Sequence, residues 1–363
     1  MPSIGVCMIV KNEANVIHEC LRSIFREMDE IVVVDTGSTD GTQEIVKSYG
    51  AKVLQDTWNQ NFAAMRNRSI DAASTDYVLV LDADERVERK VRRNIDTFIA
   101  SYPDALGSVV IRSPLVNESG DIRIVRSLNT RLFPRSHDIR YEGAIHEQVI
   151  DASQRRCRID TGIEIWHEGY RLSPPILQAK TERNISILSS EYVAKPNNGY
   201  YAYQLGKSYE SLKDFETARS YYERALQSSS PEEAFYPELV LAALYNCKKL
   251  RLQEPLWGLL QRSITIFPTL VDLHFFMGRA LIEFQIPNLE LIRTSFETCL
   301  ALGNTSAKRV IVEGVDSYLA AYNVGVYHES TGNFQQARDY YNLSAQLGYP
   351  RATLALQRVT AKS

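Results

Sequence analysis

Short apolar runs alternate with helix-like stretches over the first 170 or so residues. The apolar pattern predicts strands at 4–10, 30–35, 52–54 and 77–82, and helices at 14–25, 42–49 and 62–73. Strands that alternate with helices are typical of βαβ units and a mostly parallel sheet. The strands lack polar alternation, so we expect helices on both faces of this sheet.

The pattern changes from about Pro174, where strand signals fade and Ala, Leu, Tyr and Glu recur at helical spacing. Residues 205, 206, 209, 218, 222 and 225 have small or aromatic side chains whose offsets recur at 324, 325, 328, 337, 341 and 344. This spacing resembles the tetratricopeptide repeat, a pair of helices of about 34 residues. Weaker copies lie at 243–262 and around Gly278 and Phe296. We therefore predict an α/β domain at 1–172, a connecting helix or linker at 173–198, and an all-α repeat domain at 199–363.

Composition and charge exclude some classes of protein. The chain has 363 residues and a net charge of −3, so no basic field indicates nucleic acid binding. Five scattered cysteines without a CxxC pair indicate reduced thiols and a cytosolic location. The apolar run at the N-terminus is too short for a signal peptide, and no apolar stretch reaches the length of a membrane span.

Two of the predicted strands run directly into carboxylates. "VVVDTGSTDGT" ends its apolar run at Asp35, and "YVLVLDADER" continues into Asp82 and Asp84. Ligands bind beyond the carboxyl ends of strands in open parallel sheets, so these side chains can face one cleft. One carboxylate can accept hydrogen bonds from a ribose or a base. A D-x-D pair can hold a hard divalent cation such as Mg²⁺ or Mn²⁺.

Neither of the common glycine-rich phosphate loops is present. The first strand is not followed by G-x-G-x-x-G, and G-x-x-x-x-G-K-[ST] does not occur. A metal ion must then neutralise a diphosphate in place of such a loop.

These motifs together resemble the family 2 glycosyltransferases with a GT-A fold. The resemblance spans about residues 3–170 and rests on "SIGVCMIVKNEANVIHECLRSI", "DEIVVVDTGSTDGTQEI", "NFAAMRNRSID" and "DYVLVLDADE". With "YEGAIHEQV", "IWHEGY" and the helical repeats, the chain is similar to bacterial peptide and protein glycosyltransferases, including the sublancin-type S-glycosyltransferases. The resemblance implies a nucleotide-sugar donor with a divalent metal.

The resemblance also implies roles for particular residues. It implies nucleotide-sugar binding by Val10, Lys11, Asn12, Glu13, Asp35, Arg66, Asn67, Asp82 and Ala83. It implies metal binding by Asp84, His167 and Asp82, with Asp84 as the direct ligand. Many members of the family have a second Asp after the one at position 35, where this chain has Thr36.

Transfer with inversion needs a base that deprotonates the acceptor. We expect Glu147 to be this base, with His146 orienting it or touching the diphosphate. The segment "ERVERKVRRN" at 85–94 is expected to be a solvated helix face.

The sequence thus predicts a metal-dependent, inverting enzyme that uses a nucleotide sugar, with a UDP-hexose as the expected donor. Helical repeats form concave surfaces that suit extended partners, so the expected acceptor is a Cys, Ser or Thr side chain of a peptide or protein. The repeats can instead form a homodimer interface. Two alternatives stay open: an acceptor in a cell-envelope glycan or lipopolysaccharide, and a non-catalytic repeat adaptor with a vestigial sugar-nucleotide domain.

Overall fold

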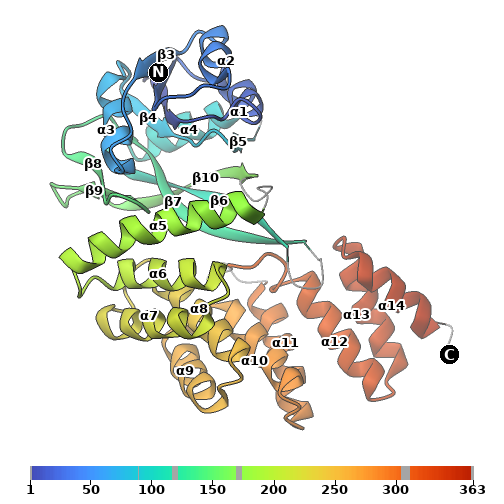
Figure 1. The fold of residues 1–363 in the computed structure, drawn as a ribbon. Helices are drawn as coiled ribbons and strands as arrows, with labels where there is room; N and C mark the ends of the chain where they lie inside the picture. The colour runs from blue at the N-terminus through green and yellow to red at the C-terminus, as the bar shows by residue number, and fades with distance from the viewer. Residues whose placement is uncertain (1, 89, 117–121, 169–173, 304–310, 361–363) are drawn as a thin grey trace. The chain divides into compact units, whose positions relative to one another are not determined.

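The computed structural model describes residues 2–88, 90–116, 122–168, 174–303 and 311–360 (Figure 1). The chain forms two compact units, Met1–Lys195 and Pro196–Ser363. The predicted boundary at 172/173 lies outside the described residues, so the three-part division at 172 and 198 stays a prediction. Within the described ranges, no helix is both long and apolar enough to cross a bilayer.

The first unit is built on an eight-stranded sheet with the order β3-β2-β1-β4-β7-β6-β10-β5. Its strands are β1 (Ile4–Val10), β2 (Glu30–Asp35), β3 (Lys52–Gln55), β4 (Tyr77–Val80), β5 (Glu85–Val87), β6 (Leu106–Val116), β7 (Ile122–Pro134) and β10 (Arg158–His167). The first four strands in this order are parallel, β7 is antiparallel to both of its neighbours, and β5 is antiparallel to β10. A separate hairpin pairs β8 (Ile139–Glu142) with β9 (Gln148–Asp151).

Successive side chains of a strand point to opposite sides of the sheet. Helices cover both of these faces. The helices of this unit are α1 (Ile17–Ile24), α2 (Thr42–Ser48), α3 (Phe62–Ala72), α4 (Val91–Ser101) and α5 (Pro174–Ala194). On β2, Ile31 and Val33 join a core formed with α1, α2 and α4, whereas Val32 joins a core formed with α3 and the β8–β9 hairpin. The two cores confirm the predicted sheet with helices on both faces.

The predicted strands and helices of the first 80 residues are all present, with shifts of a few residues at their ends. The first helix begins at Ile17 rather than Ala14, because the carbonyl of Glu13 accepts hydrogen bonds from the amides of Val16 and Ile17 in a turn. The prediction of a solvated helix face at 85–94 is wrong at its start. Glu85–Val87 form β5 at the edge of the sheet, and only 2% of Glu85 is exposed.

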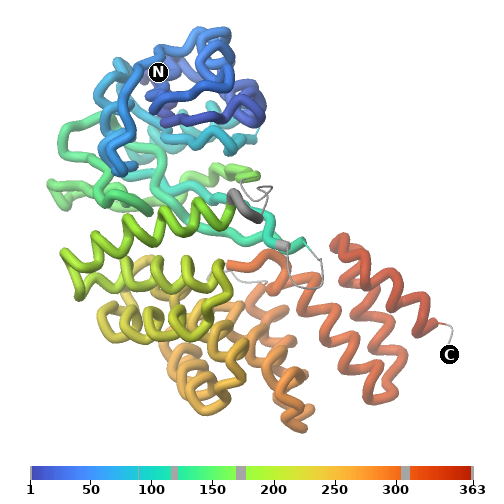
Figure 2. The backbone as a smooth tube through the Cα atoms, viewed as in Figure 1, coloured from blue at the N-terminus to red at the C-terminus, as the bar shows by residue number. Residues whose placement is uncertain are grey.

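The second unit consists of helices that follow one another as hairpins (Figure 2). Its helices are α6 (Gly199–Ser211), α7 (Phe215–Ser228), α8 (Tyr236–Lys249), α9 (Gln253–Ile266), α10 (Val271–Glu283), α11 (Leu289–Gly303), α12 (Tyr318–Ser330), α13 (Phe334–Gln346) and α14 (Pro350–Thr360). The first eight pack as the pairs α6/α7, α8/α9, α10/α11 and α12/α13, which confirms the repeat architecture.

Glycine allows the two helices of a pair to approach each other. A Cβ atom added to Gly206 would lie 2.5 Å from the ring of Tyr222, and one added to Gly325 would lie 2.6 Å from the ring of Tyr341. The two tyrosine hydroxyls donate equivalent hydrogen bonds, to Glu210 and to Glu329 respectively. The repeated offsets in the sequence therefore reflect one repeated contact between a glycine and an aromatic ring.

This contact predicts the effect of a small substitution. Gly206→Ala should lower the free energy of unfolding by about 1–3 kcal/mol, because the buried ring of Tyr222 has to move. Gly258→Ala is the control. It lies inside α9 with no atom near an added Cβ and should raise stability by about 0.5–1 kcal/mol through helix propensity. Urea denaturation measures both changes, and a neutral Gly206→Ala would contradict the packing argument.

Candidate functional site

The site lies at the carboxyl ends of the parallel strands, where the loops after β1 and β2 bind each other. The amide of Asn12 donates to Ser38 Oγ at 2.9 Å, and the amide of Thr39 donates to Asn12 Oδ1 at 2.8 Å. The amide of Glu13 donates to Thr42 Oγ1 at 2.8 Å. These bonds fix the backbone of the predicted nucleotide loop, with Asn12 in the left-handed region at a φ of 57°.

Asp35 ends β2 and is almost completely buried. Its Oδ1 accepts hydrogen bonds from the amides of Gly37 and Ser38 and from Gln43 Nε2. Burial alone would raise the pKa of Asp35, but these hydrogen bonds outweigh it and the pKa lies below its usual value. Its Oδ2 is buried and has no hydrogen-bond partner in the described structure. A charged oxygen in that state is suited to a donor from a ligand, such as a base N–H or a ribose hydroxyl.

Thr36 lies at the position where many members of the resembled family have a second Asp. Its amide and its Oγ1 both donate to the carbonyl of Val10, at 3.0 and 3.1 Å. Thr36 thus ties the end of β2 to the end of β1, and Val10 takes part through its backbone.

The D-x-D segment links β4 to β5 and meets the end of β10. Glu85 on β5 lies opposite His167 on β10. This pairing brings His167 Nε2 to 3.2 Å from Asp84 Oδ2, while His167 Nδ1 lies 3.2 Å from Ser113 Oγ. Burial would lower the pKa of His167, but the hydrogen bond and charge of Asp84 outweigh it and raise that pKa. Asp84 and His167, two of the three predicted metal ligands, are therefore neighbours.

Asp82 is held between two buried arginines. Its Oδ1 accepts from Arg66 at 2.7 Å, and its Oδ2 accepts from Arg131 at 3.1 Å. Burial would raise the pKa of Asp82, yet the two guanidinium groups hold it well below the usual range. Arg131 also donates to Glu85 at 3.2 Å, and Glu85 in turn accepts from the amide of Asp82.

The loop between β8 and β9 carries the predicted base. Glu147 accepts a hydrogen bond from Arg66 Nε, so that Arg66 connects it to Asp82. His146 precedes it in the left-handed region at a φ of 50°. Asn67 exchanges two hydrogen bonds of 2.9 Å with the backbone of Tyr141 on β8 and so positions this hairpin against α3.

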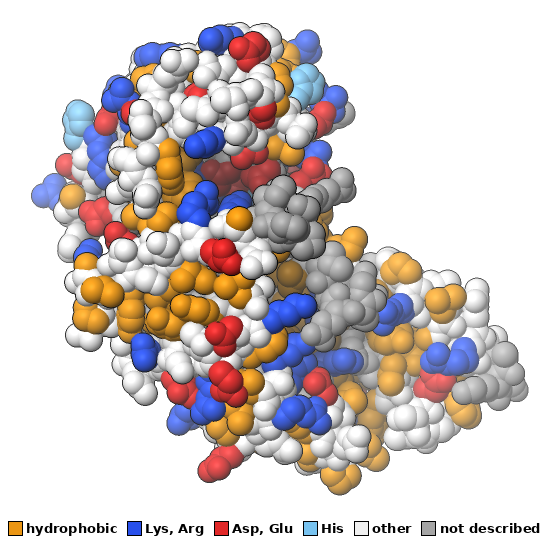
Figure 3. All heavy atoms as spheres, viewed as in Figure 1, with side chains coloured by type: hydrophobic (Ala, Val, Ile, Leu, Met, Phe, Trp, Pro, Cys, Tyr) orange, Lys and Arg blue, Asp and Glu red, His pale blue; other side chains and the backbone are white. Residues whose placement is uncertain are grey.

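The cleft has an excess of negative charge. Burial, and then the charges of Asp84, Asp82 and Asp40, raise the pKa of Glu13 to about 7, although Lys180 acts in the opposite direction. Figure 3 shows acidic side chains inside a recess of the first unit, with basic side chains along its rim. A divalent cation would relieve this repulsion.

The carboxylates fit a cation that shares its ligands with a substrate. In the described part of the chain, no three His, Cys, Asp or Glu side chains are arranged to hold a metal by themselves. Asp84 and His167 supply two donors, and Mg²⁺ or Mn²⁺ commonly completes its shell with phosphate oxygens and water. Both oxygens of Asp82 already accept from arginines, so its role as a metal ligand stays a prediction.

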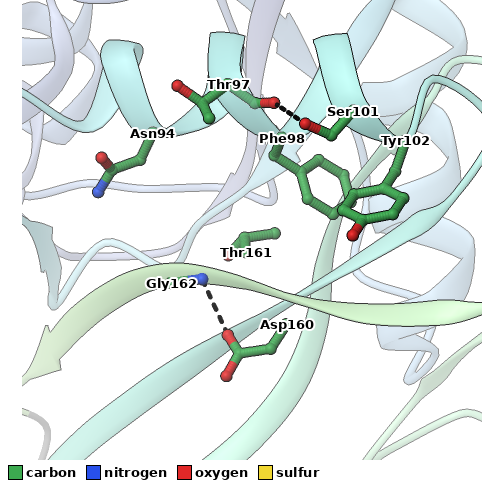
Figure 4. Close-up of a pocket in the computed structure, with 8 residues that line it drawn as sticks. All are labelled: Asn94, Thr97, Phe98, Ser101, Tyr102, Asp160, Thr161 and Gly162. Atoms are coloured by element: carbon green, nitrogen blue, oxygen red, sulfur yellow. Dashed lines mark hydrogen bonds between the residues drawn. The ribbon is translucent and has the colours of Figure 1, made fainter.

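A surface hollow lies elsewhere in the first unit. It has a volume of about 290 Å³ between α4 and the start of β10, and Tyr102, Asp160 and Thr161 help to line it (Figure 4). His167 is at the opposite end of β10, so this hollow is separate from the carboxylate cluster.

The structure thus gathers most of the predicted residues, with two exceptions. Lys11 is exposed, and Ala83 is buried among core residues, so the nucleotide roles of both stay predictions. Sequence reasoning missed Arg131 and the buried Glu85. Arg131 lies on β7, 49 residues from Asp82, and no motif marks it.

Removing Arg131 should destabilise the first unit. Arg131→Met would leave the buried carboxylate of Glu85 without its cation, at a cost of about 3–5 kcal/mol in unfolding free energy. Arg86→Met is the matched control, since its partner Glu168 is about one-third exposed and the expected loss is below about 1 kcal/mol. Chemical denaturation measures the unfolding free energy of both variants. Equal losses would show that burial does not increase the contribution of the ion pair to stability.

Comparison with known proteins agrees with the fold. The family model described as glycosyl transferase family 2 matches residues 5–150, and a tetratricopeptide repeat model matches residues 200–230. A TPR repeat-containing protein of Synechococcus elongatus is 31% identical over 66% of this chain and 60% of its own length. The glycosyltransferase SunS of Bacillus subtilis is 24% identical over 77% of this chain and 67% of its own length.

A third relative matches a shorter part of the chain. The lipopolysaccharide core biosynthesis glycosyltransferase LpsC of Rhizobium meliloti is 28% identical over 33% of this chain and 49% of its own length. The chain thus spans from about half to two-thirds of the length of these relatives. The N-terminal part of the chain belongs to glycosyl transferase family 2 and is a glycosyltransferase domain, followed by tetratricopeptide-like repeats.

Proposed function

We propose that the protein is a metal-dependent, inverting glycosyltransferase that moves a hexose from a UDP-sugar to a Cys, Ser or Thr side chain of a peptide or protein. One observation carries this proposal. The Asp84–His167 pair lies in the same cluster of carboxylates as Asp82, which Arg66 connects to Glu147. A metal-dependent transferase needs these two sets of groups together, one at the leaving diphosphate and one at the acceptor.

The donor half of the site follows from the strand ends. Asp84 and His167 would hold Mg²⁺ or Mn²⁺, which supplies charge stabilisation to the leaving diphosphate when it is bound. Asp35 would accept from the uracil or ribose through its unpartnered Oδ2. Asn12 and Glu13 would line the same pocket, because hydrogen bonds hold their loop against the one after β2.

Glu147 would act on the acceptor. As the acceptor atom forms its bond to the anomeric carbon, the bond from that carbon to the diphosphate breaks, and the acceptor's proton passes to the Glu147 carboxylate. The hydrogen bond from Arg66 fixes the orientation of this carboxylate. His146, at the adjacent position, would touch the diphosphate or support Glu147.

The repeats support a peptide or protein acceptor, since stacked helical repeats present extended surfaces to extended partners. The similarity to SunS, a glycosyltransferase, favours the same class of activity. The similarity to LpsC keeps a glycan acceptor as the second candidate. All five cysteines are free, which fits a reducing cytosolic compartment. A homodimer formed through the repeats is a further prediction.

Donor hydrolysis tests the enzyme against the adaptor alternative. The protein with Mn²⁺ should release UDP slowly from its UDP-sugar, and Asp84→Ala should reduce this release at least about 100-fold, because the diphosphate loses its metal. Asp71→Ala, an exposed carboxylate on α3, is the control and should keep the parent rate. Hydrolysis that is absent from the parent with UDP-, GDP- and other nucleotide sugars would instead support the adaptor.

Glu147→Gln tests the assigned base. The amide keeps an oxygen for Arg66 but cannot take the acceptor's proton, so transfer should fall about 100- to 10,000-fold while UDP affinity stays the same. Intact-mass analysis of candidate peptides measures transfer as a gain of one hexose. Mass gain on a glycan and on no peptide would favour the second candidate, and unchanged transfer would remove Glu147 from the mechanism.

A further inference from the structure

The cations at the centre of the cleft are compensated by its own carboxylates. Arg66 pairs with Asp82 and Glu147, and Arg131 pairs with Asp82 and Glu85. Each of these two arginines thus meets two carboxylates in the structure. A diphosphate brings at least two further negative charges to this place. The central arginines alone therefore do not balance it.

Helix α5 carries two further cations of the first unit. Lys180 and Arg183 are three residues apart, so they lie on one face of the helix. The guanidinium of Arg183 lies 5.7 Å from the ring centre of Phe62, the first residue of α3. The amide of Phe62 donates to the carbonyl of Ala144 at 2.8 Å, in the loop that leads to Glu147.

Lys180 acts on the nucleotide loop through its charge, which lowers the pKa of Glu13. The face of α5 that carries Lys180 and Arg183 thus has Arg183 against Phe62 at the start of α3 and Lys180 within electrostatic reach of Glu13.

Neither cation is committed to a carboxylate. Among the described residues, none brings a carboxylate oxygen within 4 Å of Lys180 or Arg183, and the polar bonds of Arg183 go to the side chain of Asn184. Both side chains are exposed. They contrast with Arg66 and Arg131, which are buried and paired.

We infer that Lys180 and Arg183 bind the diphosphate of the nucleotide-sugar donor, an inference that rests on the proposed function. The planar guanidinium suits two phosphate oxygens at once, and the ammonium group acts as a point charge. Asp84 and His167 would hold the metal. The diphosphate would then meet positive charge both from the metal and from α5, which offsets the repulsion by the carboxylates around Glu13.

Binding of UDP and of uridine separates this role from a structural one. Titration calorimetry with Mn²⁺ should show about tenfold weaker UDP binding for Lys180→Ala and for Arg183→Ala, because each loses a charge-assisted contact. Uridine has no phosphate, so its affinity should stay the same. Lys180→Arg should restore UDP binding. Lys195→Ala, an exposed cation just after α5, is the control and should bind UDP like the parent.

Each outcome is decisive. If the double variant Lys180→Ala/Arg183→Ala binds UDP as tightly as Lys195→Ala does, the inference is overturned and the proposed function stands. Equal losses for UDP and uridine, or a lower melting temperature, would assign α5 a structural role and also overturn it. A parent protein that binds neither UDP nor other nucleoside diphosphates would end the proposed function, and the inference with it.

Discussion

The first unit depends on how it neutralises carboxylates at the ends of buried strands. A charged oxygen in this position is costly unless a cation or a hydrogen-bond donor satisfies it. The structure uses both solutions. Asp35 accepts three hydrogen bonds at one oxygen, and Asp82 accepts one from each of two buried arginines. Asp35 Oδ2 has no hydrogen-bond partner in the described structure, and negative charge remains around Asp84 and Glu13. These two features indicate where a ligand is needed.

The mixed topology of the sheet brings a cation to these carboxylates. The parallel strands β1, β2 and β4 bring the carboxylates to one edge, but they provide no cation. Antiparallel β7 inserts next to β4 and brings Arg131, and the short strand β5 turns back beside β10 and sets Asp84 against His167. The two aspartates of the D-x-D segment thereby differ. Asp82 binds two buried arginines, whereas Asp84 pairs with His167 and is the proposed metal ligand.

The sequence predicts those parts that local patterns control. Apolar runs locate β1 and β2, and the offsets of Gly206 and Tyr222 locate a helical pair because each reflects a contact repeated along the chain. It does not predict Arg131, whose role arises from strand order and not from any neighbouring residue. The predicted solvated helix face at Glu85 is wrong for the same reason. A charge-rich stretch is typical of a solvated helix, and only the pairing with β10 shows that this one begins with a buried edge strand.

Arg66 connects the donor half of the site, at Asp82, to the candidate base Glu147. One nitrogen of its guanidinium binds Asp82, two residues before the proposed metal ligand Asp84, and another binds Glu147, the candidate base. A guanidinium is planar and rigid, so movement of one carboxylate changes the position available to the other. Arg66 would therefore hold Glu147 in a fixed orientation relative to Asp82, at the strand end where the donor is proposed to bind.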